Sequence, residues 1–312
     1  MSARSMTEPL GRIDAWLGAP APAARLRTFR VLTGMFALTY VLVRLTRFVD
    51  LVDGRPSAFE PVGVLAPLEE PLAGWIVTTI IVTVFVTGLA YTLGFAFRIA
   101  GPTFAVALLL ITTYRSSWGQ LLHFENLMVL HVGIVAFSPA GRGGDRSGES
   151  SPRFGWPLRL AAVVTATTYV LAGIAKLRGG GFEWIFGDTL QNHVAYTAAR
   201  LDVLGAESSP VAGLLVDQGW LFVVFAAATV AIELAAPIVF VTAALRVTWI
   251  VAAWLMHAMI AASMFVVFPY PLFGLAFAPL LPLERIGPAL GLRSVDPDRT
   301  SRVEPLCEAL VR

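Results

Sequence analysis

Long apolar runs separated by short polar segments dominate the chain, and they predict a bundle of membrane-spanning α-helices. A helix that crosses the hydrocarbon core of a bilayer needs about 20 mainly apolar residues. Runs that approach this length lie at 29–49, 72–94, 99–117, 121–138, 157–177, 217–243, 246–263 and 264–282. Only Ser263 and the FPYP at 268–271 separate the last two, so seven spans with a re-entrant last segment are the alternative. The predicted fold class is all-α, a polytopic membrane helix bundle.

Polar stretches at both ends divide the chain into three predicted parts. Residues 1–28 are polar or rich in Pro and Ala, with a short amphipathic stretch at Leu10–Leu17 and no apolar core of a signal peptide. Residues 29–285 form the membrane domain, and residues 286–312 form a polar tail. We therefore expect the first span to act as an uncleaved anchor.

The distribution of basic residues predicts the orientation. With the predicted spans, 16 Lys or Arg residues fall on one side and five on the other. Because cytoplasmic loops are enriched in Lys and Arg, both termini are expected in the cytoplasm of a multi-pass cell-membrane protein. Residues 139–156 are Gly/Ser-rich and predict a flexible cytoplasmic linker. Residues 178–216 mix aromatic, acidic and apolar residues, which predicts a helical segment at the outer interface.

Composition excludes several classes of function. The chain is 56% hydrophobic and 14% charged, with a mean hydropathy of +0.72, whereas a soluble domain is about 25% charged. A net charge of +2 is too small for a nucleic-acid-binding protein. The single cysteine, Cys307, excludes an internal disulfide and a cysteine-based metal site. No other spacing completes a metal site, so we expect no metal.

Lys176 is the only lysine among 23 basic residues, and it ends the predicted fifth span in YVLAGIAKL. Tyr169 shares its helix face, and Gly173 leaves a gap one turn before it. The lysine could simply extend its ammonium group to the headgroups, as arginine would do equally well. A desolvated lysine, however, can lose its proton and an arginine cannot. We therefore favour a titrating role for Lys176.

The fourth span contains the sequence HFENLMVLH. At about 100° per residue, His123, Asn126 and His131 fall within an arc of about 140°, and Glu125 points away from it. Taken alone, His131 is better explained as a hydrogen-bonded core histidine than as a ligand-binding residue.

Further polar residues lie within other spans. Arg44 and Arg47 share a face of the first span, where they either extend to the headgroups or contact an anion or a quinone oxygen. Glu233 precedes Pro237 by four residues and is expected to satisfy backbone groups freed by the proline. His257 lies in the outer half of the seventh span. Alternating span directions bring six residues to one depth and predict a pocket near the outer leaflet, roofed by the 178–216 segment: Arg44, Arg47, His123, Asn126, Lys176 and His257.

Several of these motifs resemble one family. YVLAGIAKL at 169–177, followed by WIFGDTL at 184–190, resembles the core motif of the vitamin K-dependent gamma-carboxylase membrane domain. Bacterial relatives of that domain are the horizontally transferred transmembrane (HTTM) domain proteins. HFENLMVLHVGIVAFSP at 123–139 resembles the family's fourth-span motif, and ELAAP at 233–237 and the span of His257 resemble other family segments. The resemblance covers roughly residues 25–285.

The resemblance implies a site and a chemistry. Lys176 would be the base that starts oxidation of a reduced naphthoquinone by O2, with CO2 as a further co-substrate. Asn126 or His123 would stabilise developing charge, and His257 would be a pocket histidine. The quinone or substrate pocket would include Arg44, Arg47, Tyr169, His131 and Trp184, although the RGGG at 178–181 places Trp184 further from the lysine than in the carboxylase. Expected partners are membrane lipid and a quinone or, in the alternative function below, an exported peptide.

Two other functions compete with a quinol-dependent enzyme. One is a non-catalytic HTTM protein that serves as a partner or maturation factor for an exported peptide. The other is a small-solute transporter. The one-sided clustering of polar residues and the lack of an inverted repeat in the sequence argue against transport.

Overall fold

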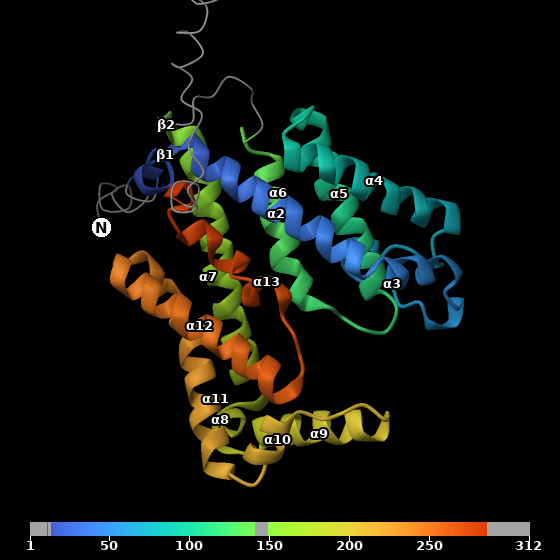
Figure 1. Cartoon of the computed structure of the whole chain (residues 1–312), viewed down its shortest axis with the longest axis vertical. Coiled ribbons are helices and arrows are strands. Elements are labelled where there is room, and N and C mark those ends of the chain that lie inside the picture. Colours follow the sequence, from blue (N-terminus) through green and yellow to red (C-terminus); the bar gives the residue numbers. More distant parts are fainter. Residues whose placement is uncertain (1–10, 12–13, 141–148, 286–312) are drawn as a thin grey trace, which may run out of the picture.

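The computed structural model describes residues 11, 14–140 and 149–285, and these residues form a helical bundle (Figure 1). The tail at 286–312, with Cys307, and the middle of the expected linker lie outside this range. Within the described residues, five helices are long and apolar enough to cross a membrane: α2 (Ala23–Val43), α4 (Gly74–Leu93), α5 (Phe97–Ser116), α7 (Pro152–Gly180) and α12 (Ala243–Met264). Two shorter apolar helices are α6 (Asn126–Ala136) and α11 (Gly219–Leu234). The predicted all-α membrane bundle is thus confirmed in class.

Short helical pieces connect the long helices. The connection from α2 to α4 holds α3 (Leu45–Val49), η1 (Asp50–Asp53), η2 (Pro56–Ala58) and η3 (Gly63–Leu65), and η4 (His123–Glu125) precedes α6. The connection from α7 to α11 holds α8 (Glu183–Phe186), α9 (Thr189–Val203) and α10 (Pro210–Leu215). The remaining pieces are η5 (Ala236–Phe240), α13 (Pro269–Leu272), η6 (Leu275–Leu280) and η7 (Leu283–Arg285).

Several helix boundaries differ from the predicted spans. α2 begins six residues earlier than expected and ends at Val43, because the backbone leaves helical geometry at Arg44 before α3 begins. α7 begins at Pro152, where the side chain of Ser151 caps the helix, so the end of the expected linker is already folded. Proline suits the first turn of a helix because its missing N–H would have no partner there.

The predicted eighth span is not a continuous helix. Residues 264–282 instead hold the single turn α13 and the 3₁₀ piece η6. Pro269, Pro271 and Pro279 lack backbone N–H donors, and Gly274 takes φ +78°, so a continuous helix is interrupted. The structure therefore agrees with the broken last segment of our alternative.

The two ends of the described chain lie at the same end of the bundle. β1 (Ala21–Pro22) pairs antiparallel with β2 (Ser150–Ser151). Arg25 near the start of α2 donates two hydrogen bonds to the carboxylate of Glu284, at 2.6 and 2.7 Å. These bonds lower the pKa of Glu284, which keeps its carboxylate charged. We call this the basic end. The cytoplasmic location of the termini remains a prediction.

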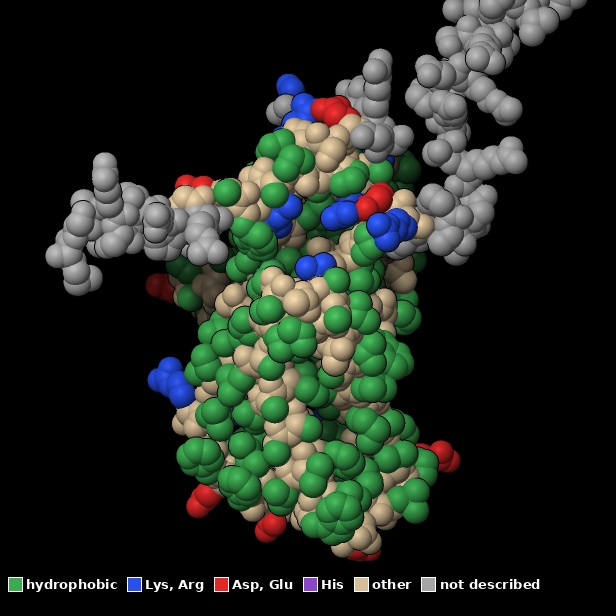
Figure 2. All heavy atoms as spheres, turned by 90° about the vertical axis from the view of Figure 1, so that its left-hand side faces the viewer, with side chains coloured by type: hydrophobic (Ala, Val, Ile, Leu, Met, Phe, Trp, Pro, Cys, Tyr) green, Lys and Arg blue, Asp and Glu red, His purple; other side chains and the backbone are tan. Residues whose placement is uncertain are grey.

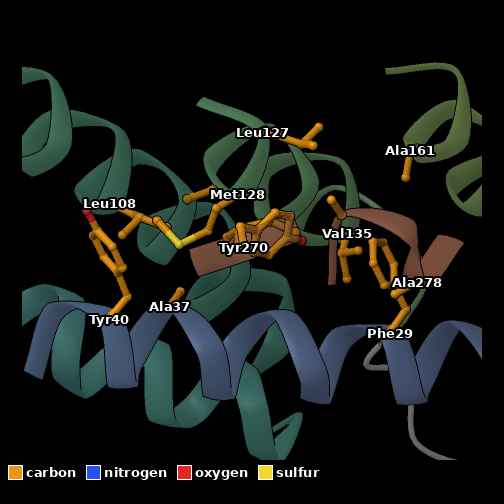
Figure 3. Close-up of a cluster of buried hydrophobic side chains, with 14 of the residues drawn as sticks. Phe29, Ala37, Tyr40, Leu108, Leu127, Met128, Val135, Ala161, Tyr270 and Ala278 are labelled. Atoms are coloured by element: carbon orange, nitrogen blue, oxygen red, sulfur yellow. The ribbon is translucent and has the colours of Figure 1, made fainter. Parts of the chain in front are cut away.

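One hydrophobic core connects α2, α4, α5, α6 and α7 with the last segment (Figure 3). Phe29 and Ala37 on α2 and Met128 on α6 are almost completely buried, and the ring of Tyr270 lies among them. The last segment therefore packs inside the bundle.

Glycines allow α2 and α4 to approach closely: a Cβ added at Gly34 would lie 2.2 Å from Oγ1 of Thr92.

The segment from α8 to α10 forms the end of the molecule opposite the two strands (Figure 1). Val194 of α9, Ala212 of α10 and Phe222 of α11 make a second, small core there. The hydroxyl of Ser209 donates to the carbonyl of Ala262 and connects this end to α12. We call residues 181–216 the outer segment, in keeping with its predicted position.

Candidate functional site

Lys176 and Glu233 form an ion pair between α7 and α11. Their Nζ and Oε1 atoms lie 2.5 Å apart, and the side chains are 25% and 6% exposed. Gly173 brings the two helices together, since a Cβ there would lie 2.9 Å from a Leu234 methyl group and 3.1 Å from Cβ of Glu233. The Nζ atom also lies 5.4 Å from the centre of the Trp184 ring. A charged pair is thus held where little water reaches it.

Tyr169 and His257 lie beside this pair. The hydroxyl of Tyr169 and Nε2 of His257 are 2.9 Å apart, and both side chains are buried. Two buried atoms of this group, Oε2 of Glu233 and Nδ1 of His257, have no hydrogen-bond partner within the described residues. Such atoms are rare in proteins, and they are free to bind a polar group of a ligand.

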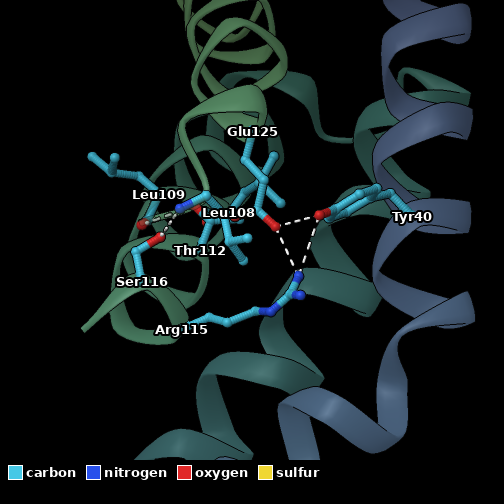
Figure 4. Close-up of polar contacts among 8 residues, drawn as sticks. Tyr40, Leu108, Leu109, Thr112, Arg115, Ser116 and Glu125 are labelled. Carbon is cyan, nitrogen blue, oxygen red and sulfur yellow. Dashed lines mark hydrogen bonds and ion pairs between the residues drawn. The ribbon is translucent and has the colours of Figure 1, made fainter. Parts of the chain in front are cut away.

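A second polar cluster joins α2, α5 and η4 (Figure 4). Nη1 of Arg115 lies 2.9 Å from Oε1 of Glu125 and 3.2 Å from the hydroxyl of Tyr40, which itself donates to Glu125. The guanidinium of Arg44 lies 4.1 Å from the centre of the Tyr40 ring. Oε2 of Glu125 is buried without a hydrogen-bond partner among the described residues.

Aromatic rings connect the two clusters. Phe124 lies 6.5 Å from Tyr40 and 6.0 Å from Phe268, measured between ring centres. Phe268 lies 5.3 Å from His257, which lies 5.8 Å from Tyr169. Five rings from separate parts of the sequence thus form a continuous apolar path from Arg44 to Lys176.

The structure corrects the expected arrangement of the fourth span. Glu125 is buried in the second cluster, whereas His123 and Asn126 are exposed. The side chain of Asn126 makes no hydrogen bond within the described residues. The ring of His123 lies 5.9 Å from Phe268. His123 and Asn126 thus lie on the exposed side and Glu125 on the buried side, as their spacing predicts, but His131 of the same helix is buried and does not join them.

Glu233 also differs from expectation. It does not bind backbone groups freed by Pro237, because α11 ends at Leu234 and the chain continues in η5. It instead binds Lys176, because α11 packs along α7.

His131 is fully buried at the contact of three segments. Its Nδ1 lies 2.8 Å from the hydroxyl of Tyr270, and its Nε2 lies 3.1 Å from Oγ1 of Thr165 and 3.2 Å from the carbonyl of Ala161. Because both ring nitrogens have protein partners, His131 has the surroundings of a core histidine rather than of a pocket residue.

The remaining predicted pocket residues behave differently from one another. Trp184 reaches Lys176 despite the RGGG insertion, because α7 continues to Gly180 before the chain turns into α8. Arg47 is exposed and has no partner among the described residues. Arg115 was not among the predicted site residues, although an arginine near the end of one apolar span and a glutamate near the start of the next are a usable signal. Within the described residues, no group of three His, Cys, Asp or Glu side chains could hold a metal ion.

Comparison with known proteins gives one family. No curated protein and no solved structure matches the sequence. The HTTM domain matches residues 19–282, which covers most of the chain and both polar clusters. The chain therefore belongs to the HTTM domain family.

Proposed function

We propose that this protein is a membrane enzyme in which Lys176 acts as a base in reduced-quinone-linked chemistry, of the epoxidation or carboxylation type. The observation that carries the proposal is the buried pair of Lys176 and Glu233, with Nζ and Oε1 at 2.5 Å. The HTTM domain occurs in proteins related to the vitamin K-dependent carboxylase. Membership therefore supports this class of chemistry.

The pairing with a carboxylate supports a base function. A base must be neutral when it acts. Because Nζ of Lys176 lies 2.5 Å from Oε1 of Glu233, the ammonium proton would pass directly to the carboxylate when the amine acts as the base.

The surroundings fit a flat apolar ring that carries polar oxygens. The path of aromatic rings from Tyr40 to Tyr169 offers an apolar surface, and the unpartnered Nδ1 of His257 and Oε2 of Glu233 offer polar contacts. Arg44 would neutralise negative charge at the far end of this path. A bound reduced naphthoquinone would supply the electrons for reaction with O2. CO2 would be a co-substrate only in a carboxylation.

Within such a site, each side chain would have a separate role. Lys176 would take a proton from a hydroxyl of the bound ring, Glu233 would hold the proton that Lys176 had given up, and Tyr169 would orient His257 through their hydrogen bond. Trp184 would shield the lysine from water at the outer segment. The side chains of His123 and Asn126 are exposed on the protein surface, so we assign them no step in the reaction.

The test is O2-dependent oxidation of a reduced naphthoquinone by the purified protein in lipid nanodiscs. We expect Lys176→Arg to lower the turnover at least about 100-fold, because arginine keeps the charge but cannot act as a base. Arg178→Gln is the matched control, since Arg178 is exposed on the same helix two residues away. Full turnover by a folded Lys176→Arg protein would exclude the proposal.

One observation favours a second candidate, a non-catalytic partner of an exported peptide. The outer segment exposes large apolar side chains, among them Phe182, Phe186, Tyr196, Val203 and Leu204. Such side chains could bind a peptide or lie against lipid. Co-purification of an exported peptide with both the wild type and Lys176→Arg, without quinol oxidation by either, would favour this function.

A further inference from the structure

A second region of interest lies at the basic end, far from the lysine. A half-open cavity of about 220 Å³ is enclosed by the start of α2, the first turns of α7, η5, the start of α12 and the last segment. Three half-buried arginines from three helices line it, Arg25, Arg159 and Arg246. Nothing in the proposed reaction uses these residues.

Each arginine is held in place by part of its guanidinium group. Arg25 binds Glu284 through Nε and Nη2, and Arg246 donates from Nε to the carbonyl of Val239 at 3.0 Å. Arg159 donates from Nη1 to the carbonyl of Ala19. Within the described part of the chain, Nη1 of Arg25, Nη2 of Arg159 and both Nη atoms of Arg246 make no hydrogen bond. Both terminal nitrogens of the Arg246 guanidinium group are therefore available to bind a ligand.

The backbone is shaped to hold Arg159. A Cβ added at Gly155 would lie 2.1 Å from the carbonyl oxygen of Ala19 and 2.5 Å from Nη1 of Arg159. The ring of Trp16 packs near the same guanidinium, at 5.9 Å, and against Phe240 at 5.4 Å. Arg159 is therefore a fixed part of the cavity wall rather than an arginine extended into solvent.

Charge in the cavity is unbalanced. Among the described residues at the cavity, three arginines and one carboxylate, that of Glu284, give a formal charge of +2. Arg25 and Arg159 line the same cavity. Like charges are held together at a stability cost unless an anion lies between them. A phosphate can accept two parallel hydrogen bonds, which matches the planar, forked guanidinium group of arginine.

Besides Gly155, the other residues that line the cavity carry apolar side chains. They are Trp16, Ala21, Leu158, Ala162, Phe240, Pro279 and Leu280. Figure 2 shows Lys and Arg side chains gathered in the upper part of this face, above a broad hydrophobic surface. Arg159 lies seven residues after the start of α7, about 10 Å along the helix axis. The cavity thus joins a cationic rim to the apolar surface, as a headgroup and its acyl chains require.

We propose that this cavity binds the phosphate headgroup of an anionic membrane phospholipid. The phosphate would lie between Arg246 and Arg159, with the acyl chains on the apolar wall and along α12. Basic pockets between membrane helices bind headgroups of this kind. A bound lipid would connect α2, α7 and α12 at the end where both chain ends meet.

The experiment measures lipid binding to the full chain in detergent by native mass spectrometry and thermal unfolding. The probes are phosphatidylglycerol, zwitterionic phosphatidylcholine with the same acyl chains, and soluble glycerol 3-phosphate. We expect phosphatidylglycerol alone to bind and to raise the unfolding temperature. Arg159→Gln and Arg246→Gln should each weaken its binding about fivefold. Arg98→Gln is the matched control, because Arg98 is exposed on α5 outside the cavity and carries the same charge.

Three results would overturn the proposal. The first is equal binding of phosphatidylglycerol and phosphatidylcholine. The second is equal weakening of binding by Arg98→Gln and by the cavity variants. The third is binding of soluble glycerol 3-phosphate as tight as that of phosphatidylglycerol, which would make the ligand a free phosphate ester. Lys176→Arg separates this proposal from the proposed reaction, because it should leave lipid binding unchanged. If Arg246→Gln fails to fold, Arg246→Lys keeps the charge but removes the fork and is expected to weaken binding.

Discussion

At the scale of single residues, the pair of Lys176 and Glu233 is the feature on which the proposed chemistry depends. The carboxylate is 6% exposed, and its Oε2 has no hydrogen-bond partner among the described residues. Replacement of one member of a buried pair by a neutral side chain leaves the other member as an uncompensated charge, whereas replacement of both leaves two neutral side chains. The pair is therefore expected to show strong energetic coupling.

We expect Lys176→Gln alone to destabilise the folded protein by about 3–5 kcal/mol, because Glu233 would remain buried without its cation. The double variant Lys176→Gln/Glu233→Gln should recover a large part of that loss. Thermal or denaturant unfolding in detergent, analysed as a double-mutant cycle with Glu233→Gln, measures the coupling. Additive losses would show that the two side chains do not act as a pair.

Which residues matter was partly predictable from the sequence. Lys176 stood out because it is the only lysine, and Tyr169 because it shares a helix face with it. The partner Glu233 could not be found by counting residues from a predicted helix end, because the depth of α11 depends on how far the outer segment extends. The burial of Glu125 could not be predicted, because helical periodicity separates the faces of a span but does not say which face packs against the bundle.

At the scale of elements, close contacts at glycines set the distance between helices. Gly34 on α2 lies against Thr92 and Tyr91 on α4, and Gly88 on α4 lies against Leu38 and Phe104. Small residues at helix contacts allow backbones to approach, which is the main source of helix association within a membrane. These contacts connect α2 to α4 over much of their length.

We expect Gly34→Ala to destabilise the bundle by about 1–3 kcal/mol, because the new methyl group would lie 2.2 Å from Oγ1 of Thr92. Gly133→Ala is the matched control, since Gly133 of α6 has nothing within 4 Å of an added Cβ. That variant should be neutral or more stable by about 0.5–1 kcal/mol, because alanine favours a helix. Unfolding midpoints of the two variants compare the sites directly, and equal midpoints would contradict this account.

Hydropathy predicted the elements well where a run of apolar residues forms one uninterrupted helix. It predicted α4 and α5 to within a few residues. It failed at 264–282, since that run is as apolar as the others but its prolines prevent a continuous helix. A hydropathy window measures affinity for an apolar environment, and in this segment protein supplies that environment instead of lipid.

At the scale of the whole molecule, the arrangement predicts which surfaces face each side of the membrane. β2 and the ion pair of Arg25 with Glu284 lie at one end, and the outer segment lies at the other (Figure 1). From the asymmetry of basic residues, we predict that the first end faces the cytoplasm.

We expect a cysteine at position 150 to react with an impermeant maleimide only after the cells are lysed, and a cysteine at position 207 to react in intact cells. Ser150 and Glu207 are both exposed, so access to the reagent depends on the membrane alone. The variants Ser150→Cys and Glu207→Cys would be made in a Cys307→Ser background. Labelling of both positions in intact cells would overturn the orientation and the outward-facing site.

The broken last segment has a consequence for the order in which the protein is assembled. Its non-helical backbone cannot be placed in lipid alone, because its polar groups would have no partners there. Some of those groups pair within the segment, and others find partners on neighbouring helices, such as the carbonyl of Ala276, which accepts from Thr165, and the carbonyl of Leu272, which accepts from Trp254. We therefore expect residues 265–282 to pack after α6, α7 and α12 are in place. A chain that lacked this segment would leave the buried His131 without its partner, the hydroxyl of Tyr270.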